Sequence, residues 1–194
     1  MTYQVHSSQK PEWFSLDNHR PEGSIGPKTE GCMSYTPGTG FVVTLRCFEK
    51  NPQIIYTQPD DPVFRDSCLE VFLNCYPELP DYGYLNVEIN GAGTMRCRFG
   101  KDRENRYFLL ERGIPQPRVT VTKEQDYWQI NLEIPETLLE AVYERPCAFA
   151  PGHQMRGNFY KCGDDTASPH WSSWAEIPRL DFHLPEYFGL LEIQ

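Results

Sequence analysis

Residues 84–90 read YLNVEIN, an uninterrupted alternation in which every second side chain is aliphatic. Leu85, Val87 and Ile89 fall on one side of such a segment, and the asparagines and the glutamate fall on the other. This period of two is typical of a β-strand with one buried face. Residues 67–74 repeat the design, with three apolar residues at alternate positions. Because strands that follow each other in sequence are often adjacent, we expect the two to be neighbours in one sheet.

The same pattern recurs along most of the chain. It predicts further strands at residues 41–47, 94–99, 106–110, 118–122, 127–134 and 156–162. One short helix is expected at 136–142, because Pro135 suits a first helical position, and two turns of helix must pack on a sheet to be stable. Many short strands and 17 prolines predict an all-β fold, an antiparallel two-sheet β-sandwich with one short helix. We expect a single domain over residues 1–194, with an irregular N-terminal arm over residues 1–40.

Composition and charge exclude several classes of protein. The formal net charge is −9, and an acidic chain without a basic stripe repels phosphate backbones and anionic lipid surfaces. We therefore expect no nucleic-acid partner and no membrane partner, whereas a neutral sugar is compatible with any net charge. The sequence has no run of about 18 apolar residues and no apolar signal segment. A cytoplasmic location is therefore predicted, or secretion if a leader has been removed.

The seven cysteines are dispersed and include no CxxC pair. Their spacing to one another and to the five histidines is not that of a zinc site. An odd, scattered set of thiols suits a reducing compartment. Cysteines within strand patterns are expected to behave as small buried hydrophobes.

An acidic loop at residues 60–66 leads into the strand that carries Glu70. Phe64 lies in this loop, and Glu70 faces away from the apolar side of its strand. A carboxylate on that face can accept two hydroxyl hydrogen bonds. The alternative is an ion pair with an arginine of a neighbouring strand, and the two roles are compatible.

Residues 86–98 place amides, a carboxylate and guanidinium groups close together, among them Asn90, Arg96 and Arg98. If this segment neighbours the Glu70 strand, the polar faces form one surface. Sugar recognition requires such convergent donors and acceptors on a rigid sheet. The alternative is an ordinary solvated sheet face.

Residues 157–174 contain Asn158 and end in a loop with Trp171 and Trp174. Two tryptophans three residues apart, among Ser, Pro and His, are not both expected in a core. An indole is the largest platform for the C–H face of a pyranose, so we predict that at least one of the two contacts ligand, with Trp174 preferred. The alternative is that one of them closes the end of the sandwich. Trp128 belongs to an alternating core face and is assigned to packing.

In their order along the chain, these segments resemble family 9 carbohydrate-binding modules and their DOMON-like relatives, over roughly residues 40–194. The segments that carry the resemblance are 64–72, 86–93, 128–135, 158–164, 171–174 and the tail 182–189, FHLPEYFG. The resemblance implies a β-sandwich that binds sugar ends, a module often attached to xylanases.

Carried over residue by residue, the resemblance implies that Phe64 and either Trp174 or Trp171 sandwich a terminal sugar. Glu70 matches the strand carboxylate, and one of the two arginines named above matches the nearby guanidinium. Phe64 stands where such modules have a tryptophan, which reduces the stacking area. The predicted ligand is a mono- or oligosaccharide, bound without catalysis.

The resemblance also implies structural calcium. Asp60, Asp61 and Asp66 are candidate oxygen ligands, although no EF-hand spacing is present and acidic loops are more often simply solvated.

Three other functions stay open at this point. Glycoside hydrolysis needs two carboxyl groups about 5–10 Å apart, which Glu70 and Glu88 supply if their strands are adjacent, although nothing in the sequence indicates a raised pKa. Haem binding needs histidine or methionine ligands, and the spacing of these residues suggests no pair. A purely structural interaction module needs no ligand.

Overall fold

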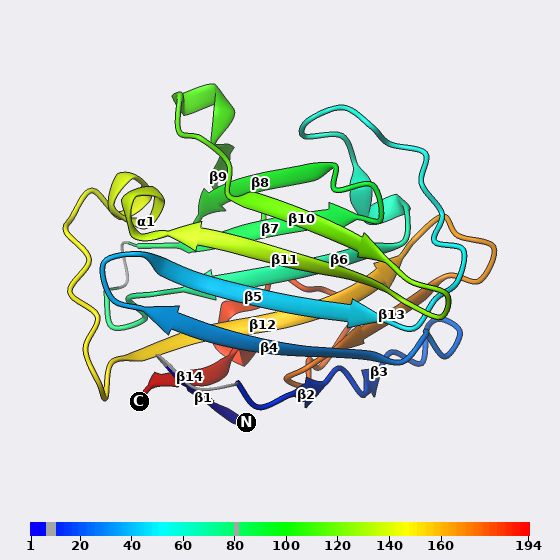
Figure 1. Ribbon diagram of the computed structural model, residues 1–194, viewed down its shortest axis with the longest axis horizontal. Helices are drawn as coiled ribbons and strands as arrows, with labels where there is room; N and C mark the ends of the chain where they lie inside the picture. The colour runs from blue at the N-terminus through cyan, green and yellow to red at the C-terminus, as the bar shows by residue number, and fades with distance from the viewer. Residues whose placement is uncertain (7–10, 80–81) are drawn as a thin grey trace.

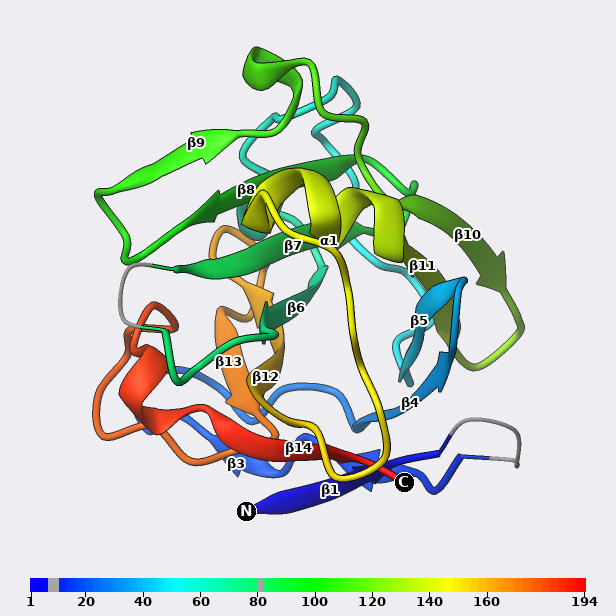
Figure 2. The ribbon, with the colours of Figure 1, turned by 90° about the vertical axis from the view of Figure 1, so that its left-hand side faces the viewer.

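The computed structural model describes residues 1–6, 11–79 and 82–194, and its strands form two sheets that pack against each other (Figure 1, Figure 2). The larger sheet has the order β1 (Thr2–Val5), β14 (Gly189–Ile193), β12 (Gln154–Gly163), β6 (Cys68–Asn74), β7 (Tyr84–Asn90), β8 (Met95–Gly100) and β9 (Arg106–Phe108), with β13 (His170–Ser173) pairing β12 and β3 (Asn18–His19). The smaller sheet has the order β10 (Arg118–Lys123), β11 (Trp128–Pro135), β5 (Gly40–Cys47), β4 (Thr29–Thr36) and β2 (Phe14–Ser15). The predicted all-β sandwich is confirmed.

The core between the sheets is built from the alternating positions that the sequence marks as apolar. Leu85, Val87 and Ile89 of β7 are fully buried, and so are Val43 and Leu45 on the facing sheet. Burial of each such side chain contributes about 1.5–3 kcal/mol. Trp128 also lies in this core, as predicted.

The helix α1 (Glu136–Tyr143) confirms the one short helix. Figure 2 shows it lying across one end of the sandwich, near β7, β8 and β11. Pro135 is the residue that caps the helix rather than its first helical residue. Tyr143 is buried and its hydroxyl donates to the Gly83 carbonyl at 3.1 Å, which ties the helix to the larger sheet. No helix within the described ranges has the length and apolar character that a bilayer crossing requires.

The prediction of an irregular N-terminal arm is wrong for much of residues 1–40. β1 pairs β14 in parallel, and β4 pairs β5 along eight residues, so this part of the chain supplies strands to both sheets. The β4 segment was missed because glycine and serine interrupt its pattern. The glycine, Gly31, is required by packing, since a Cβ there would lie 2.4 Å from Leu45 and 2.8 Å from Phe14.

The outer face of the larger sheet carries a second apolar layer. Phe72, Tyr84 and Tyr160 stand on this face and pack with Phe182 and Phe188 of the C-terminal tail. The strands β6 and β7 are therefore buried on both faces. This polar face is therefore not an ordinary solvated sheet face, which was the alternative interpretation of the sequence. The cavity described below lies where the covering layer leaves an opening.

Two 3-10 turns help to build that cover. η1 (Val63–Arg65) carries Phe64, and η3 (Pro185–Tyr187) lies in the tail, while a third, η2 (Leu110–Arg112), follows β9. Val63 of η1 is fully buried in the second layer, so the loop before β6 is anchored on the sheet.

Candidate functional site

A cavity of about 490 Å³ opens on the outer face of the larger sheet. Its volume falls within the ~300–1,000 Å³ typical of small-ligand sites. It is lined by side chains from strands β6, β7, β8, β9, β12 and β13, from the turn before β6, from the loop between β8 and β9, from the turn after β12 and from residues 180–183: Phe64, Glu70, Glu88, Arg96, Arg98, Arg103, Glu104, Arg106, Cys162, Asp164, Trp171, Leu180, Asp181, Phe182 and His183. Charged groups of both signs and aromatic rings therefore share one cavity.

Two glutamates form the floor. Glu70 of β6 lies directly opposite Glu88 of β7 in the strand register, and they are 3% and 5% exposed. Glu70 accepts a hydrogen bond from Cys162 Sγ at 3.0 Å. Burial raises the pKa of Glu70 well above its usual range, and the charge of Glu88 raises it further. Glu70 is therefore the carboxyl that holds a proton more readily, so it can donate as well as accept.

Polar atoms at the floor lack partners among the described residues. Oε2 of Glu88 is buried without a hydrogen bond, and its nearest cation, Nε of Arg96, is 3.9 Å away, which is too long for one. Nε of Arg98 is also buried without a partner. Because buried polar groups are normally paired, this floor is suited to a ligand that carries hydroxyl groups.

The arginines are held in place by aromatic rings. The Arg98 guanidinium lies 4.0 Å from the centre of the Phe108 ring, and that of Arg96 lies 5.1 Å from the same ring and 5.7 Å from Phe64. Burial lowers the pKa of Arg98, and the charges of Arg96 and Arg106 lower it further. The ring contacts fix the direction of the donors without using up their N–H groups.

Phe64 and Trp171 form the aromatic wall. Trp171 is partly buried, and its Nε1 donates to Oδ1 of Asp164 at 2.6 Å. Gly23 backs the indole, since a Cβ at Gly23 would lie 2.7 Å from Cζ3 of the ring. The backbone N–H of Asp164 donates to the Phe64 carbonyl at 3.2 Å, so the two ring-bearing segments are joined.

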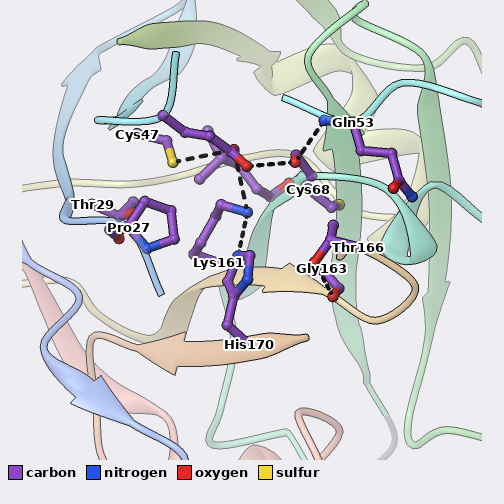
Figure 3. Close-up of polar contacts among 12 residues, drawn as sticks. Pro27, Thr29, Cys47, Gln53, Cys68, Lys161, Gly163, Thr166 and His170 are labelled. Atoms are coloured by element: carbon purple, nitrogen blue, oxygen red, sulfur yellow. Dashed lines mark hydrogen bonds and ion pairs between the residues drawn. The ribbon is translucent and has the colours of Figure 1, made fainter. Parts of the chain in front are cut away.

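A buried polar network joins β12 and β13 (Figure 3). Lys161 is fully buried, and its Nζ lies 2.8 Å from Nε2 of His170 and 3.7 Å from a carboxylate oxygen of Glu49. Nδ1 of His170 lies 2.7 Å from the Ser168 carbonyl, which can only accept, so Nδ1 carries the proton and Nε2 accepts from the ammonium. His170 is therefore held neutral. The network sets the position of the next residue, Trp171.

The structure brings together five of the eight residues predicted to bind ligand: Phe64, Glu70, Arg96, Arg98 and Trp171. They come from four separate parts of the chain and line the same cavity. Of the two tryptophans, Trp171 is the one that lines the cavity.

The expectation for Trp174 needs correction. It is 2% exposed and lies in the core between the sheets, with its ring centre 5.6 Å from that of Phe14 and 5.7 Å from that of Phe159. A Cβ at Gly189 would lie 2.3 Å from the indole, so the ring is also enclosed on that side. An indole covered in this way has no free face for a sugar.

The two predicted asparagines are also structural. Asn158 is fully buried and exchanges two hydrogen bonds with the backbone of Ala175. Asn90 is fully buried, and it donates to Asp66 at 3.0 Å and to a backbone carbonyl at 2.8 Å. Both side chains are occupied by the fold and lie outside the cavity lining.

Among the described residues, the three aspartates proposed for calcium do not form a group compact enough to hold a metal ion. Asp66 accepts from the backbone N–H groups of Ile55 and Tyr56. Asp61 accepts from two N–H groups of its own loop, and Asp60 accepts from the backbone of Cys97. Each carboxylate stabilises a loop, so these residues do not fit a calcium ion. Calcium binding stays a prediction without a site.

Sequence reasoning missed several residues at the cavity: Arg103, Glu104, Arg106, Cys162, Asp164, Leu180, Asp181, Phe182 and His183. Arg106 stands on β9, beside the Arg98 strand, and its Nη1 donates to Asn86 at 2.6 Å. Phe182 and His183, the first two residues of the tail that carries the family resemblance, also line the cavity. Alternation of side chains indicates that Arg106 belongs to a strand. It does not indicate which part of the sheet the C-terminal tail covers.

A family model described as carbohydrate-binding family 9 matches residues 7–193. The chain belongs to carbohydrate-binding family 9. The predicted family is therefore confirmed over almost the whole chain. No curated protein matched the sequence.

Solved structures of similar fold include two from this family. A family 9 module from Caldicellulosiruptor kristjanssonii, in complex with cellotriose, is 10% identical, with all of this chain and 94% of that chain covered and a TM-score of 0.72. The same organism's module in complex with glucose is also 10% identical, with coverages of 100% and 96% and a TM-score of 0.74. A candidate carbohydrate-binding protein from Bacteroides uniformis is 23% identical, with coverages of 100% and 99% and a TM-score of 0.83. At these identities the likeness concerns the fold.

Proposed function

We propose that the cavity on the outer face of the larger sheet binds the terminal sugar of a mono- or oligosaccharide, without cleaving it. The observation that carries this proposal is the pairing of an aromatic wall with a buried floor where Oε2 of Glu88 and Nε of Arg98 have no hydrogen-bond partner among the residues that the structure describes. A sugar presents both a C–H face for rings and hydroxyl groups for such atoms. Membership of carbohydrate-binding family 9 supports the same ligand class.

Each part of the cavity has a role in this proposal. Phe64 and Trp171 contact the C–H faces of the ring. Glu70 and Glu88 accept from sugar hydroxyls, and Glu70 also donates when it holds its proton. Arg98 donates its unpaired Nε–H. Each contact is individually modest, so we expect dissociation constants from about micromolar to about millimolar for a short ligand.

The positions of the two glutamates argue against hydrolysis. The sequence gives no indication of a raised pKa, whereas in the folded protein burial raises the pKa of both Glu70 and Glu88. A glycosidase, however, needs its two carboxyl groups on either side of the scissile bond. Directly paired residues on adjacent strands have Cβ atoms about 4.5–5.5 Å apart on the same face. The two glutamates therefore reach the sugar from one side.

Calorimetric titration with glucose and with cello-, xylo- and manno-oligosaccharides tests this proposal. We expect saturable binding of at least one of these ligands, weakened at least about tenfold in Glu70→Gln, because the substitution replaces a carboxyl oxygen that can accept from a sugar hydroxyl with an NH2 group that can only donate. Glu133→Gln is the matched control, since Glu133 is an exposed residue of β11 on the other sheet. No binding of any of these sugars, or equal effects of the two substitutions, would contradict the proposal.

A second assay separates binding from catalysis. The same oligosaccharides are incubated with the protein, and new reducing ends are measured. We expect none above background. Release of reducing sugar that is lost in Glu70→Gln would show a hydrolase in place of a binding module.

A further inference from the structure

Two cysteines and a glutamate meet at the floor of the cavity. Cys68 of β6 and Cys162 of β12 face each other in the strand register, and Glu70 follows two residues after Cys68 on the same face. One ligand atom from each residue, two thiol sulfurs and a carboxylate oxygen, lies within 4.8 Å of both others. Among the described residues, this is the group of His, Cys, Asp and Glu side chains compact enough for a metal ion.

The spacing of these atoms suits tetrahedral coordination. A zinc ion with Zn–S and Zn–O bonds of about 2.3 and 2.1 Å holds its ligand atoms about 3.6–3.8 Å apart. Sγ of Cys162 is 3.0 Å from Oε1 of Glu70 and 3.5 Å from the Phe64 carbonyl oxygen. Small side-chain rotations are therefore enough to admit an ion between the sulfurs and the carboxylate. The Phe64 carbonyl oxygen, which lies 3.5 Å from Sγ of Cys162, is a candidate for the fourth ligand.

The ion also has a route to this position. Cys68 and Cys162 are 0% and 1% exposed, so neither thiol is open to the protein surface. Cys162 and Glu70 nevertheless line the cavity, which leads from solvent to the floor. Thiolate ligands select zinc, cadmium and copper(I) over calcium and magnesium.

From this arrangement we propose that the cavity floor is a binding site for a thiophilic metal ion such as Zn²⁺, held by Cys68, Glu70 and Cys162. When the ion binds, the two thiols release their protons to solvent, and so does Glu70 where its carboxyl group is protonated. Because the three ligands come from two strands and are distant in sequence, no spacing motif marks the site. The absence of a zinc-type spacing in the sequence is therefore compatible with it.

The site does not depend on the proposed sugar binding, but the two share Glu70. A metal ion that uses the Glu70 carboxylate removes it as an acceptor for sugar hydroxyls. Metal and sugar are therefore expected to compete, and by linkage each lowers the affinity of the other by the same factor.

The test is titration of the reduced, folded protein with Zn²⁺, with Cd²⁺ as a second probe. We expect one equivalent of Zn²⁺ to bind, and bound Cd²⁺ to show the ultraviolet charge-transfer band of two thiolates. Cys68→Ser and Cys162→Ser should each weaken Zn²⁺ binding at least about tenfold, since loss of an outer-shell partner alone costs about 10–100-fold. Cys32→Ser is the matched control, because Cys32 is a buried cysteine of β4 in the other sheet and should bind like the native protein.

Glu70→Gln provides a second variant that leaves the thiols in place. It should weaken Zn²⁺ binding while the Cd²⁺ band keeps its two-thiolate intensity. Circular dichroism of every variant establishes that it is folded. Zn²⁺ binding that is equal in native protein and in both cysteine variants, or a Cd²⁺ titration without a thiolate band, would overturn the proposal. Sugar binding without metal binding would refute this site alone, and metal binding without sugar binding would refute the proposed function alone.

Discussion

Replacing Trp171 by alanine removes the largest ring of the aromatic wall. The structure holds this indole in a set orientation, through the 2.6 Å hydrogen bond to Asp164 and the close backing of Gly23. The side chain is partly exposed and lines the cavity, so one part of the ring is available to a ligand. The substitution therefore removes contact area without opening a void in the main core.

The expected size of the effect follows from the area that a sugar covers. If a pyranose removes about 80 Å² of indole surface from water, the contact contributes about 2 kcal/mol at ~25 cal/mol per Å². Loss of this contact weakens binding about 30-fold. Trp171→Phe keeps a smaller ring and should give an intermediate affinity.

Isothermal titration calorimetry with the best sugar found for the native protein measures these affinities. Trp13→Ala is the control, because Trp13 is 40% exposed and stacks on Arg46 of the other sheet, 4.7 Å from ring centre to guanidinium carbon. We expect a change of less than about twofold in the control. Equal losses in Trp13→Ala and Trp171→Ala would refute the location of the site, provided that both variants keep the native circular dichroism spectrum.

Three further outcomes concern stability. Trp174→Ala should lower the free energy of unfolding in urea by about 3–5 kcal/mol, as expected for a large buried ring, and a loss of less than about 1 kcal/mol would contradict its place in the core. Lys161→Ala should lower the free energy of unfolding by a similar ~3–5 kcal/mol, because the substitution leaves Glu49 without its cation. The control Lys123→Ala, at an exposed position of β10, should change the free energy of unfolding by less than about 0.5 kcal/mol. Burial, with the charges of Arg106 and Arg103, lowers the pKa of His183 to about 2. The contribution of His183 to stability is therefore fully present above the unfolded pKa of about 6.5. As the pH falls below that value, the free energy of unfolding decreases by up to ~1.4 kcal/mol per pH unit. In His183→Gln, the free energy of unfolding should fall less steeply between pH ~6 and ~5, and the difference in slope from the native protein should approach that value. The raised pKa values of Glu70 and Glu88 act in the opposite sense above pH ~4.5, but they are present in both proteins and cancel in the comparison.

Alternation of side chains predicted most strands of the two sheets and the inward faces of β6, β7 and β11. It failed for β4, where Gly31 and Ser34 interrupt the pattern, although β4 pairs β5 along its full length. It also failed to show that β6 and β7 are buried on both faces. Polar residues such as Glu70 and Asn90 look like a solvated face in sequence. In the structure both are buried: Glu70 lies in the cavity floor, and Asn90 holds the loop before β6 through Asp66 and the Tyr56 carbonyl.

The candidate site shows the same division. Glu70, Arg96 and Arg98 were predicted because they stand on the outward face of strands that were expected to pair, and strand pairing is a local rule. The choice between Trp171 and Trp174 depends on the register of β13 against β12, which decides which indole points outward and which points between the sheets. A period of two cannot decide this in a loop rich in Ser and Pro.

From the sequence alone, the strand pattern determined that the chain folds as an all-β sandwich and that polar side chains gather opposite the apolar face of two strands. Those features depend on contacts between neighbouring residues and on the fixed period of a strand. The tertiary structure alone decided which polar groups are buried without partners, which indole reaches the cavity, and that Cys68, Glu70 and Cys162 meet. Each of these depends on segments distant in sequence being brought together by packing, and no local pattern records that.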